Sequence, residues 1–280
     1  MNHKLLIGDC KDTLKTIHNN SIDLVVTSPP YNVGKDYGVF KENLRLRDYE
    51  EFTHNWLYEI FRILKPTGKF ALNVSSTDKN HIDELHCIIA KDMGFKIREK
   101  INWIKTTPTK SRYLISQSNK SYFNRFGKLA MTYEPIIIFQ KQALNTNTFV
   151  NKDVPECWRY NTWFIAPVRP RENHPAPFPE EIPKRLITLY TKEGNTILDP
   201  FSGTGTTMKV ASDLKRNSIG CELSQEYAGY TKERLGISID IQDLTKFQES
   251  KTPRIKLNKI TPEMFSSLSN ELKGGIKNGN

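Results

Sequence analysis

The sequence predicts an α/β fold in which an open, mostly parallel sheet carries helices on both faces. Three observations predict it: short β-branched runs recur along the chain, segments with helical periodicity separate several of them, and most runs end where a helix begins. Such alternation of strand and helix is typical of open α/β sheets. Ligands of these sheets collect at the carboxyl ends of the strands, so chemistry is expected at the turns that follow them.

Seven apolar runs are predicted to be strands, and five segments with helical spacing are predicted to be helices. The strands cover residues 5–7, 22–26, 70–74, 97–104, 135–139, 195–198 and 218–221. The helices cover residues 49–64, 82–93, 183–190, 206–214 and 225–235. The first helix stops before the turn Pro66-Thr67-Gly68, and the second stops before Gly94.

The composition indicates one large catalytic domain and a polyanionic partner. The chain has 280 residues, of which 37% are hydrophobic, and we assign residues 1–248 to a single catalytic domain. Lys and Arg number 41 against 31 Asp and Glu, which gives a formal net charge of +10 and favours a polyanion as partner. Solubility alone is the alternative explanation of this charge.

The cysteines and the amino terminus bear on metals and on location. The four cysteines are far apart and form no C-x-x-C pair, so neither a zinc site nor a disulfide framework is indicated, and no metal is expected. The amino terminus lacks the apolar core of a secretory signal, and no run has the length needed to span a bilayer. We therefore expect a soluble cytoplasmic protein without a membrane partner.

Three polar stretches interrupt the alternation, and a basic tail follows it. Residues 32–48 form a loop long enough to act as a lid or a substrate flap. Residues 105–128 interleave basic and aromatic side chains without one acidic residue, and residues 142–173 carry tryptophans and arginines among turn-forming residues. The Lys-rich tail, residues 249–280, contains one predicted helix at 262–272.

The turn after the run 195–198 has the composition of a nucleotide-cofactor loop. It reads Asp199-Pro200-Phe201-Ser202-Gly203-Thr204-Gly205-Thr206-Thr207, so small residues lie where the backbone must pass close to a ligand, and a helix start at Thr206 leaves amides free. The three-glycine dinucleotide fingerprint is absent. A carboxylate at the strand end would repel a pyrophosphate and suits a cationic amino group better.

Glu222 adds a second acidic strand end, roughly 20 residues beyond these glycines. At that distance an acidic side chain can bind both hydroxyls of a ribose. A dinucleotide and other adenosine cofactors would both fit the glycine turn alone. The two acidic positions together favour an adenosine that carries an amino-acid moiety.

The turn after the run 22–26 needs a different explanation. In Ser28-Pro29-Pro30-Tyr31, two prolines fix the backbone and remove two amide donors, so the turn presents carbonyl oxygens and a hydroxyl beside an aromatic ring. Such acceptors suit a flat ring with an NH2 group. Accepting hydrogen bonds from both N–H groups would hold the amine pyramidal, so that its lone pair could attack an electrophilic methyl group. Tyr31 would stack on the base, which must first leave the duplex.

With these motifs the chain resembles the bacterial amino-methylating DNA methyltransferases that use S-adenosylmethionine, of the circularly permuted β group. The resemblance runs from about residue 4 to about residue 235, and its motifs occur in the order of that family. They are Leu6-Ile7-Gly8-Asp9-Cys10, Thr27 with the turn to Tyr31, Lys65-Pro66-Thr67-Gly68-Lys69, Asn102-Trp103-Ile104-Lys105, Tyr133-Glu134-Pro135-Ile136-Ile137-Ile138-Phe139, His174-Pro175-Ala176-Pro177-Phe178-Pro179 and the turn from Asp199 to Thr207.

The resemblance implies a Rossmann-like, seven-stranded, mostly parallel sheet with permuted motif order, and it assigns roles to the turns. Ser28 and the carbonyl of Pro29 would orient the amine, Pro30 would fix the turn, and Tyr31 would stack. The implied cofactor contacts are Asp9, Cys10, His174, Phe178, Asp199, Phe201, Ser202, Gly203, Gly205, Thr206 and Glu222. Taken singly, Asp9 is more often a helix cap, Cys10 a small buried residue and His174 a loop histidine.

The implied partner is duplex DNA, with a cognate restriction endonuclease as a further partner and a monomer or homodimer as the assembly, in a bacterial cytoplasm at the nucleoid. Residues 142–173 lie where the family usually places target recognition, and residues 105–128 are expected to share that role. Lys and Arg would anchor phosphates, while a solvated face is the alternative. The predicted DNA contacts are Lys105, Lys110, Arg112, Lys120, Arg125, Lys128, Arg159 and Arg169.

The target base is predicted from Ser28 and from the cysteines. Methylation of a ring carbon would need a cysteine nucleophile, usually after a proline, and no cysteine here follows one. Within the family, Ser at the first position of the turn mostly accompanies N4 of cytosine, whereas Asp mostly accompanies N6 of adenine. We therefore expect N4 of cytosine, with N6 of adenine as the alternative. A non-catalytic nucleic-acid-binding module is a third hypothesis, but it would be expected to lose the acceptor turn, Asp199 or Glu222, and all are present.

Overall fold

The computed structural model describes residues 1–34, 43–75, 81–105, 133–141, 151, 153–168 and 179–245. Several predicted positions lie outside the described residues: Lys110, Arg112, Lys120, Arg125, Lys128, Arg169, His174, Phe178 and the tail with its helix at 262–272. Met1–Phe247 form one compact unit.

Within the described residues, nine strands form one mixed sheet in the order β6-β4-β5-β3-β2-β7-β8-β1-β9. β5 is antiparallel to both of its neighbours, and the other pairs are parallel, which confirms the predicted α/β class with a mostly parallel sheet. The strands are β1 (His3–Ile7), β2 (Ile22–Thr27), β3 (Leu64–Asn73), β4 (Lys96–Ile104), β5 (Tyr133–Gln140), β6 (Thr162–Phe164), β7 (Thr196–Asp199), β8 (Asn217–Glu222) and β9 (Asp240–Asp243).

The sheet differs from the seven predicted strands in two ways: it has two additional edge strands, β6 and β9, and β3 begins earlier than predicted. β6 and β9 are short and partly polar, so neither shows an apolar run from which a strand could be predicted. β3 begins at Leu64 rather than Phe70, because the expected turn at Pro66-Thr67-Gly68 is a bulge within the strand. The pairing with β2 shifts register there, from Ile22 opposite Leu64 to Leu24 opposite Lys69.

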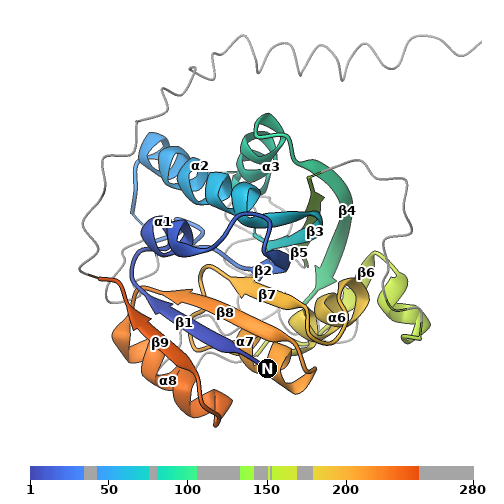
Figure 1. Cartoon of the computed structure of the whole chain (residues 1–280). Coiled ribbons are helices and arrows are strands. Elements are labelled where there is room, and N and C mark those ends of the chain that lie inside the picture. Colours follow the sequence, from blue (N-terminus) through green and yellow to red (C-terminus); the bar gives the residue numbers. More distant parts are fainter. Residues whose placement is uncertain are drawn as a thin grey trace, which may run out of the picture. The chain divides into compact units, whose positions relative to one another are not determined.

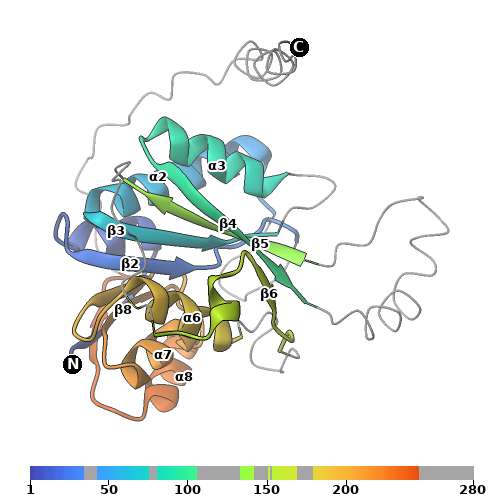
Figure 2. The ribbon, with the colours of Figure 1, turned by 90° about the vertical axis from the view of Figure 1, so that its right-hand side faces the viewer.

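Helices cover both faces of the sheet (Figures 1 and 2). α2 and α3 cover one face, over a core that includes Trp56, Ile60, Phe70 and Phe139, and α6 and α7 cover the other. The amphipathic spacing of α2 puts Trp56, Leu57, Ile60 and Ile63 on its buried side. The helices are α1 (Cys10–Thr13), α2 (Leu46–Ile63), α3 (Ile82–Asp92), α6 (Glu181–Tyr190), α7 (Thr206–Asp213) and α8 (Gln225–Leu235). None of those in the described part of the chain combines the length and apolarity needed to cross a membrane.

The strand order explains where a ligand can bind. β2 leads through α2 to β3 on one side, whereas β7 leads through α7 to β8 on the other, so the order reverses between β2 and β7. Such a reversal opens a crevice at the carboxyl ends of the two strands. β1 lies between β8 and β9, with Ile7 opposite Glu222, so the first strand extends the part of the sheet built by the last third of the described chain (Figure 1).

Candidate active site

One buried carboxylate joins the two predicted turns at the strand reversal. Thr27 Oγ1 donates to Asp199 Oδ1 at 2.7 Å, and Thr207 Oγ1 donates to Asp199 Oδ2 at 2.8 Å. The amide of Phe201 donates to Oδ1 at 3.1 Å. Burial raises the pKa of Asp199 to about 6, against the lowering effect of these donors. Asp199 therefore connects the residue before Ser28 to the glycine loop and to α7, and its predicted contact with a cationic amino group stays a prediction.

The glycine loop is shaped by close contacts that exclude a side chain. Gly203 and Gly205 have φ of 54° and 76°, and a Cβ on Gly205 would lie 2.6 Å from Thr231 Cγ2. Thr231 Oγ1 donates to the carbonyl of Gly203 at 3.1 Å. α7 begins at Thr206, as predicted, and the Thr206 hydroxyl accepts a bond from Arg234.

Two predicted cofactor residues pack at the base of this loop. Phe201 meets Trp56 edge to face, with ring centroids 5.4 Å apart. Ser202 Oγ is buried and has no hydrogen-bond partner in the part of the chain that the structure describes. It packs against Gly220 of β8, where an added Cβ would lie 2.7 Å from it, so it fixes the loop closely onto the neighbouring strand.

Glu222 at the end of β8 holds the loop from the other side. Its Oε2 accepts the amide of Gly203 at 2.7 Å, and its Oε1 accepts the amide of Ser224 at 2.8 Å. Burial, with a smaller contribution from the nearby charge of Asp199, raises the pKa of Glu222 to about 7 against the lowering effect of its backbone donors. Two adjacent strand ends thus present carboxyls whose ionised forms are costly, and a cationic ligand would favour those forms.

The catalytic turn closes on itself through two hydroxyls. Ser28 Oγ and Tyr31 Oη are 2.8 Å apart, and Tyr31 Oη donates to the carbonyl of Asn73 at 3.3 Å. Tyr49 Oη, from α2, donates to the carbonyl of Pro30 at 2.7 Å. Asn73 and Tyr49 were not among the site residues that the sequence predicted. A polar residue directly after the buried run of β3 was a usable signal for Asn73, but nothing in the sequence pointed from Tyr49 to Pro30.

The loop predicted at residues 32–48 is closed at its base by one side chain. Asn32 Nδ2 donates to the carbonyl of Leu44 at 2.8 Å, and the amide of Leu44 donates to Asn32 Oδ1 at 2.8 Å. Asn32 has a positive φ of 56°, a conformation that Asn tolerates better than most residues. This pair of bonds joins Asn32, the first residue of the predicted loop, to Leu44. The loop ends earlier than predicted, because α2 already begins at Leu46 rather than at Tyr49.

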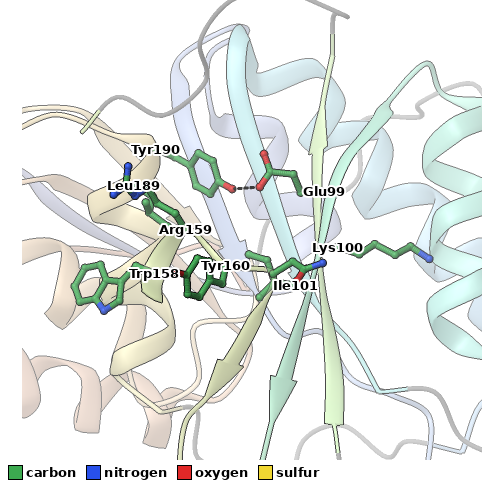
Figure 3. A pocket seen from close by; sticks show the side chains of 9 residues that line it. Glu99, Lys100, Ile101, Trp158, Arg159, Tyr160, Leu189 and Tyr190 are labelled. Atoms are coloured by element: carbon green, nitrogen blue, oxygen red, sulfur yellow. Dashed lines mark hydrogen bonds between the residues drawn. The ribbon is translucent and has the colours of Figure 1, made fainter. Parts of the chain in front are cut away.

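The two described DNA-contact candidates lie in different places. Lys105, at the carboxyl end of β4, forms an ion pair with Glu134 and has its Nζ 4.9 Å from the centroid of the Trp103 ring. Arg159 lines a pocket of about 160 Å³ between the middle of β4 and the end of α6, where Tyr190 Oη donates to Glu99 at 3.1 Å (Figure 3). Residues of the catalytic turn do not line this pocket.

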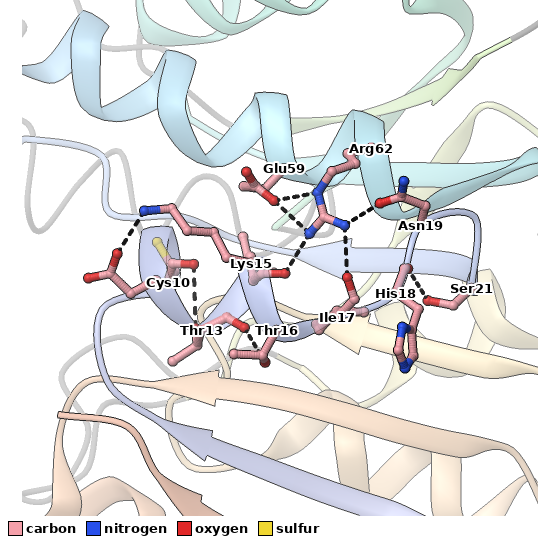
Figure 4. Close-up of polar contacts among 12 residues, drawn as sticks. Cys10, Thr13, Lys15, Thr16, Ile17, His18, Asn19, Ser21, Glu59 and Arg62 are labelled. Carbon is pink, nitrogen blue, oxygen red and sulfur yellow. Dashed lines mark hydrogen bonds and ion pairs between the residues drawn. The ribbon is translucent and has the colours of Figure 1, made fainter. Parts of the chain in front are cut away.

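The end of β1, next to the end of β8, carries Asp9 and Cys10. Asp9 caps α1 by accepting the amide of Lys11 at 3.0 Å, and its carboxylate lies 3.3 Å from Lys11 Nζ. The Cys10 thiol is buried, which raises its pKa well above the ordinary value. Arg62 of α2 holds the segment that follows, donating to the carbonyls of Leu14 and Ile17 at 2.9 and 2.8 Å (Figure 4).

A glycine loop at a strand end, joined through Asp199 to a proline-fixed turn at the strand reversal, is typical of α/β proteins that bind a nucleotide-like ligand in the crevice. A family model described as DNA methylase matches residues 22–233. The chain belongs to this DNA methylase family, as the sequence motifs indicated.

Relatives and solved structures agree with this membership. The Type II methyltransferase M.HpaI of Haemophilus parainfluenzae is 32% identical over 84% of this chain and 74% of its own length. The DNA adenine methyltransferase YhdJ of Escherichia coli is 28% identical over 94% of each chain. A DNA modification methylase from Thermus thermophilus superposes with a TM-score of 0.66 at 26% identity, over 86% of this chain and 100% of that one.

Two further structures extend the comparison. The same Thermus methylase in complex with S-adenosyl-L-methionine superposes with a TM-score of 0.63 at 25% identity, over 86% of this chain and 100% of that one. The cytosine-N4-specific PvuII DNA methyltransferase superposes with a TM-score of 0.66 at 20% identity, over 98% of this chain and 94% of that one, a likeness of fold.

Proposed function

We propose that this DNA amino-methyltransferase methylates N4 of cytosine in duplex DNA at a specific site. The observation that carries the proposal is Ser28 as the first residue of the acceptor turn, its hydroxyl 2.8 Å from Tyr31 Oη at the strand reversal. A serine hydroxyl is a smaller and neutral acceptor compared with the aspartate that mostly accompanies adenine in this family. The relatives named Type II methyltransferases support a cognate restriction endonuclease as a partner.

S-adenosylmethionine is the cofactor of this enzyme, and the residues present fit it. The glycine at position 205, where a side chain would clash with Thr231, and the carboxyl groups of Asp199 and Glu222 at the two neighbouring strand ends together suit a nucleoside with a cationic substituent. Asp9 and the Cys10 amide at the end of β1 would contact the adenine. Bound there, the cofactor supplies a methyl group on a sulfonium centre.

The chain's own residues would prepare the nitrogen that accepts the methyl group. The flipped base would stack on Tyr31. Ser28 Oγ and the Pro29 carbonyl would accept hydrogen bonds from the two N–H groups of its amine. Tyr49, by holding the Pro30 carbonyl at 2.7 Å, keeps this turn in one conformation. Proximity and fixed dipoles in a site shielded from water supply much of the rate.

N6 of adenine is the second candidate, favoured by the relative named a DNA adenine methyltransferase. DNA methylated by the purified protein with tritiated S-adenosylmethionine, then digested to nucleosides and analysed by mass spectrometry, separates the two products. We expect N4-methylcytosine, and N6-methyladenine would refute the cytosine assignment.

Two further results bear on the assignment of the turn and on catalysis itself. Ser28→Ala or Tyr31→Ala is expected to lose most methyl transfer, and a variant of either kind that works at the wild-type rate would refute the role of this turn. Cofactor binding without transfer to any DNA would instead support the non-catalytic binding module.

A further inference from the structure

Three side chains, the exposed Tyr133 and Phe164 and the half-buried Ile104 between them, form a stripe across the ends of β4, β5 and β6. Ile104 at the end of β4 pairs with Tyr133 of β5 in antiparallel register and with Phe164 of β6 in parallel register. Directly paired residues project from the same face of a sheet. We call Tyr133, Ile104 and Phe164 the aromatic stripe.

The stripe projects from the face of the sheet that α2 and α3 partly cover. Trp103 and Trp163, one residue before Ile104 and Phe164, are buried in the core on the opposite face, under α6. Alternation along each strand therefore directs Ile104 and Phe164 away from that core. Tyr133 is 42% exposed and Phe164 is 59% exposed. Two exposed aromatic side chains on either side of an apolar residue form a continuous apolar surface, which marks an interaction site.

The stripe begins on β5, and only β3 lies between β5 and β2, the strand that the catalytic turn follows. Asn73 of β3, on which Tyr31 Oη rests, pairs with Ile136 of β5, and its side-chain amide donates to the carbonyl of Pro135 at 3.2 Å. Tyr31 packs against the core on the face of α2 and α3, the same face as the stripe. Neighbouring strands lie about 4.8 Å apart, so three strands give a surface about 10 Å wide. It starts at Tyr133, three residues or about 10 Å along β5 from Ile136.

We propose that the rings of the aromatic stripe stack on the base faces that flipping exposes in the DNA substrate. The proposal rests on the proposed function, because it needs a base to leave the duplex and expose the faces of its neighbours. Aromatic rings bind such faces without regard to sequence. A second copy of this chain is the other candidate occupant, but the net charge of +10 repels a second copy and attracts DNA.

Substitution of the two rings tests the stripe. Phe164→Ala and Tyr133→Ala are measured with a short single strand carrying 2-aminopurine, at several salt concentrations, with Tyr58→Ala as the matched control because Tyr58 of α2 is 44% exposed. We expect binding to weaken roughly 5- to 100-fold for each stripe variant and to stay unchanged for the control. The salt dependence should keep its slope, since no phosphate contact is removed. Phe164→Tyr should restore binding, whereas Phe164→Leu should not.

Several outcomes would overturn the proposal. Wild-type binding by both alanine variants, or full binding by Phe164→Leu, would show that the rings do not stack on bases. Loss of a dimer in sedimentation with unchanged DNA affinity would assign the stripe to a contact between copies. S-adenosylmethionine affinity, measured on each variant, verifies the folded state. If the wild type methylates no DNA but Phe164→Ala still weakens binding, the proposed function is refuted and the role of the stripe is not. If the wild type methylates DNA but both alanine variants bind DNA as the wild type does, only the role of the stripe is refuted.

Discussion

Thr27→Val removes the bond that ties the catalytic turn to Asp199. The substitution keeps the branched shape and deletes a donor 2.7 Å from Asp199 Oδ1, which leaves the carboxyl with Thr207 and the amide of Phe201. A hydrogen bond to a charged group contributes about 1.5–3 kcal/mol. We expect the free energy of unfolding in urea to fall by about 2 kcal/mol, and methyl transfer to slow because the turn loses its anchor.

Thr53→Val is the matched control for this loss. The Thr53 hydroxyl is fully buried in α2 and has no hydrogen-bond partner within the described residues, so its removal deletes no bond. Its unfolding free energy should stay equal to that of the wild type or rise slightly, because an unsatisfied buried hydroxyl is lost. Thr27→Ser should recover most of the stability and activity. Equal unfolding free energies for Thr27→Val and Thr53→Val would refute the reasoning.

The pH dependence of the Thr27→Val effect gives a second check. The pKa of Asp199 is raised from 3.8 to about 6 in the folded protein, so its protonation favours folding, and this contribution is lost as pH rises through about 6. The Thr27 bond opposes the rise of the pKa by stabilising the carboxylate. Its removal should therefore destabilise the protein more above that pKa than well below it. A penalty that is equal at both ends of the range would contradict this assignment.

Three further predictions concern the loop, its carboxylate and its support. Gly205→Ala should weaken S-adenosylmethionine binding in calorimetry at least tenfold, since the new Cβ would lie 2.6 Å from Thr231 Cγ2 at a φ of 76°; unchanged affinity would show that the loop adapts. Cofactor affinity should rise with pH through about 7 as Glu222 ionises, and Glu222→Gln should flatten this profile; a wild-type profile already flat there would be inconsistent with Glu222 as the responsible group. Arg62→Met should lower the free energy of unfolding by about 2–3 kcal/mol, because two carbonyls and the Glu59 carboxylate lose their donor, and urea unfolding indistinguishable from the wild type would count against it.

The sequence predicted the turns of this site better than it predicted their supports. Proline fixes the backbone, and glycine permits conformations that other residues avoid, so the composition of the two turns was readable without a structure. The donor to Asp199, in contrast, is Thr27, 172 residues earlier in the chain. A threonine after a buried strand has many partners that sequence alone cannot rank, and the same holds for Tyr49 and Pro30.

The sheet shows the same limit at its edges. The apolar central strands were predicted because burial on both faces demands apolar residues. β9 is largely exposed, and β6 has a single buried residue, Trp163, so their pairing depends on backbone bonds to a neighbour rather than on a pattern of their own. Phe164 was therefore placed by the sequence in a recognition segment, and its position in β6 beside Ile104 required the structure.

The place of β1 between β8 and β9 has a consequence for synthesis of the protein. The apolar strand Leu5-Leu6-Ile7 pairs with Gly220, Cys221 and Glu222, 215 residues later. At about 5–20 residues per second, a ribosome needs roughly 10–40 s to supply that partner. During this interval the strand has neither of its neighbours, and the nascent chain has no complete cofactor crevice. The order of its segments thus delays enzyme competence until the last third of the described chain has emerged, and makes the first strand the one that a chaperone would have to shield.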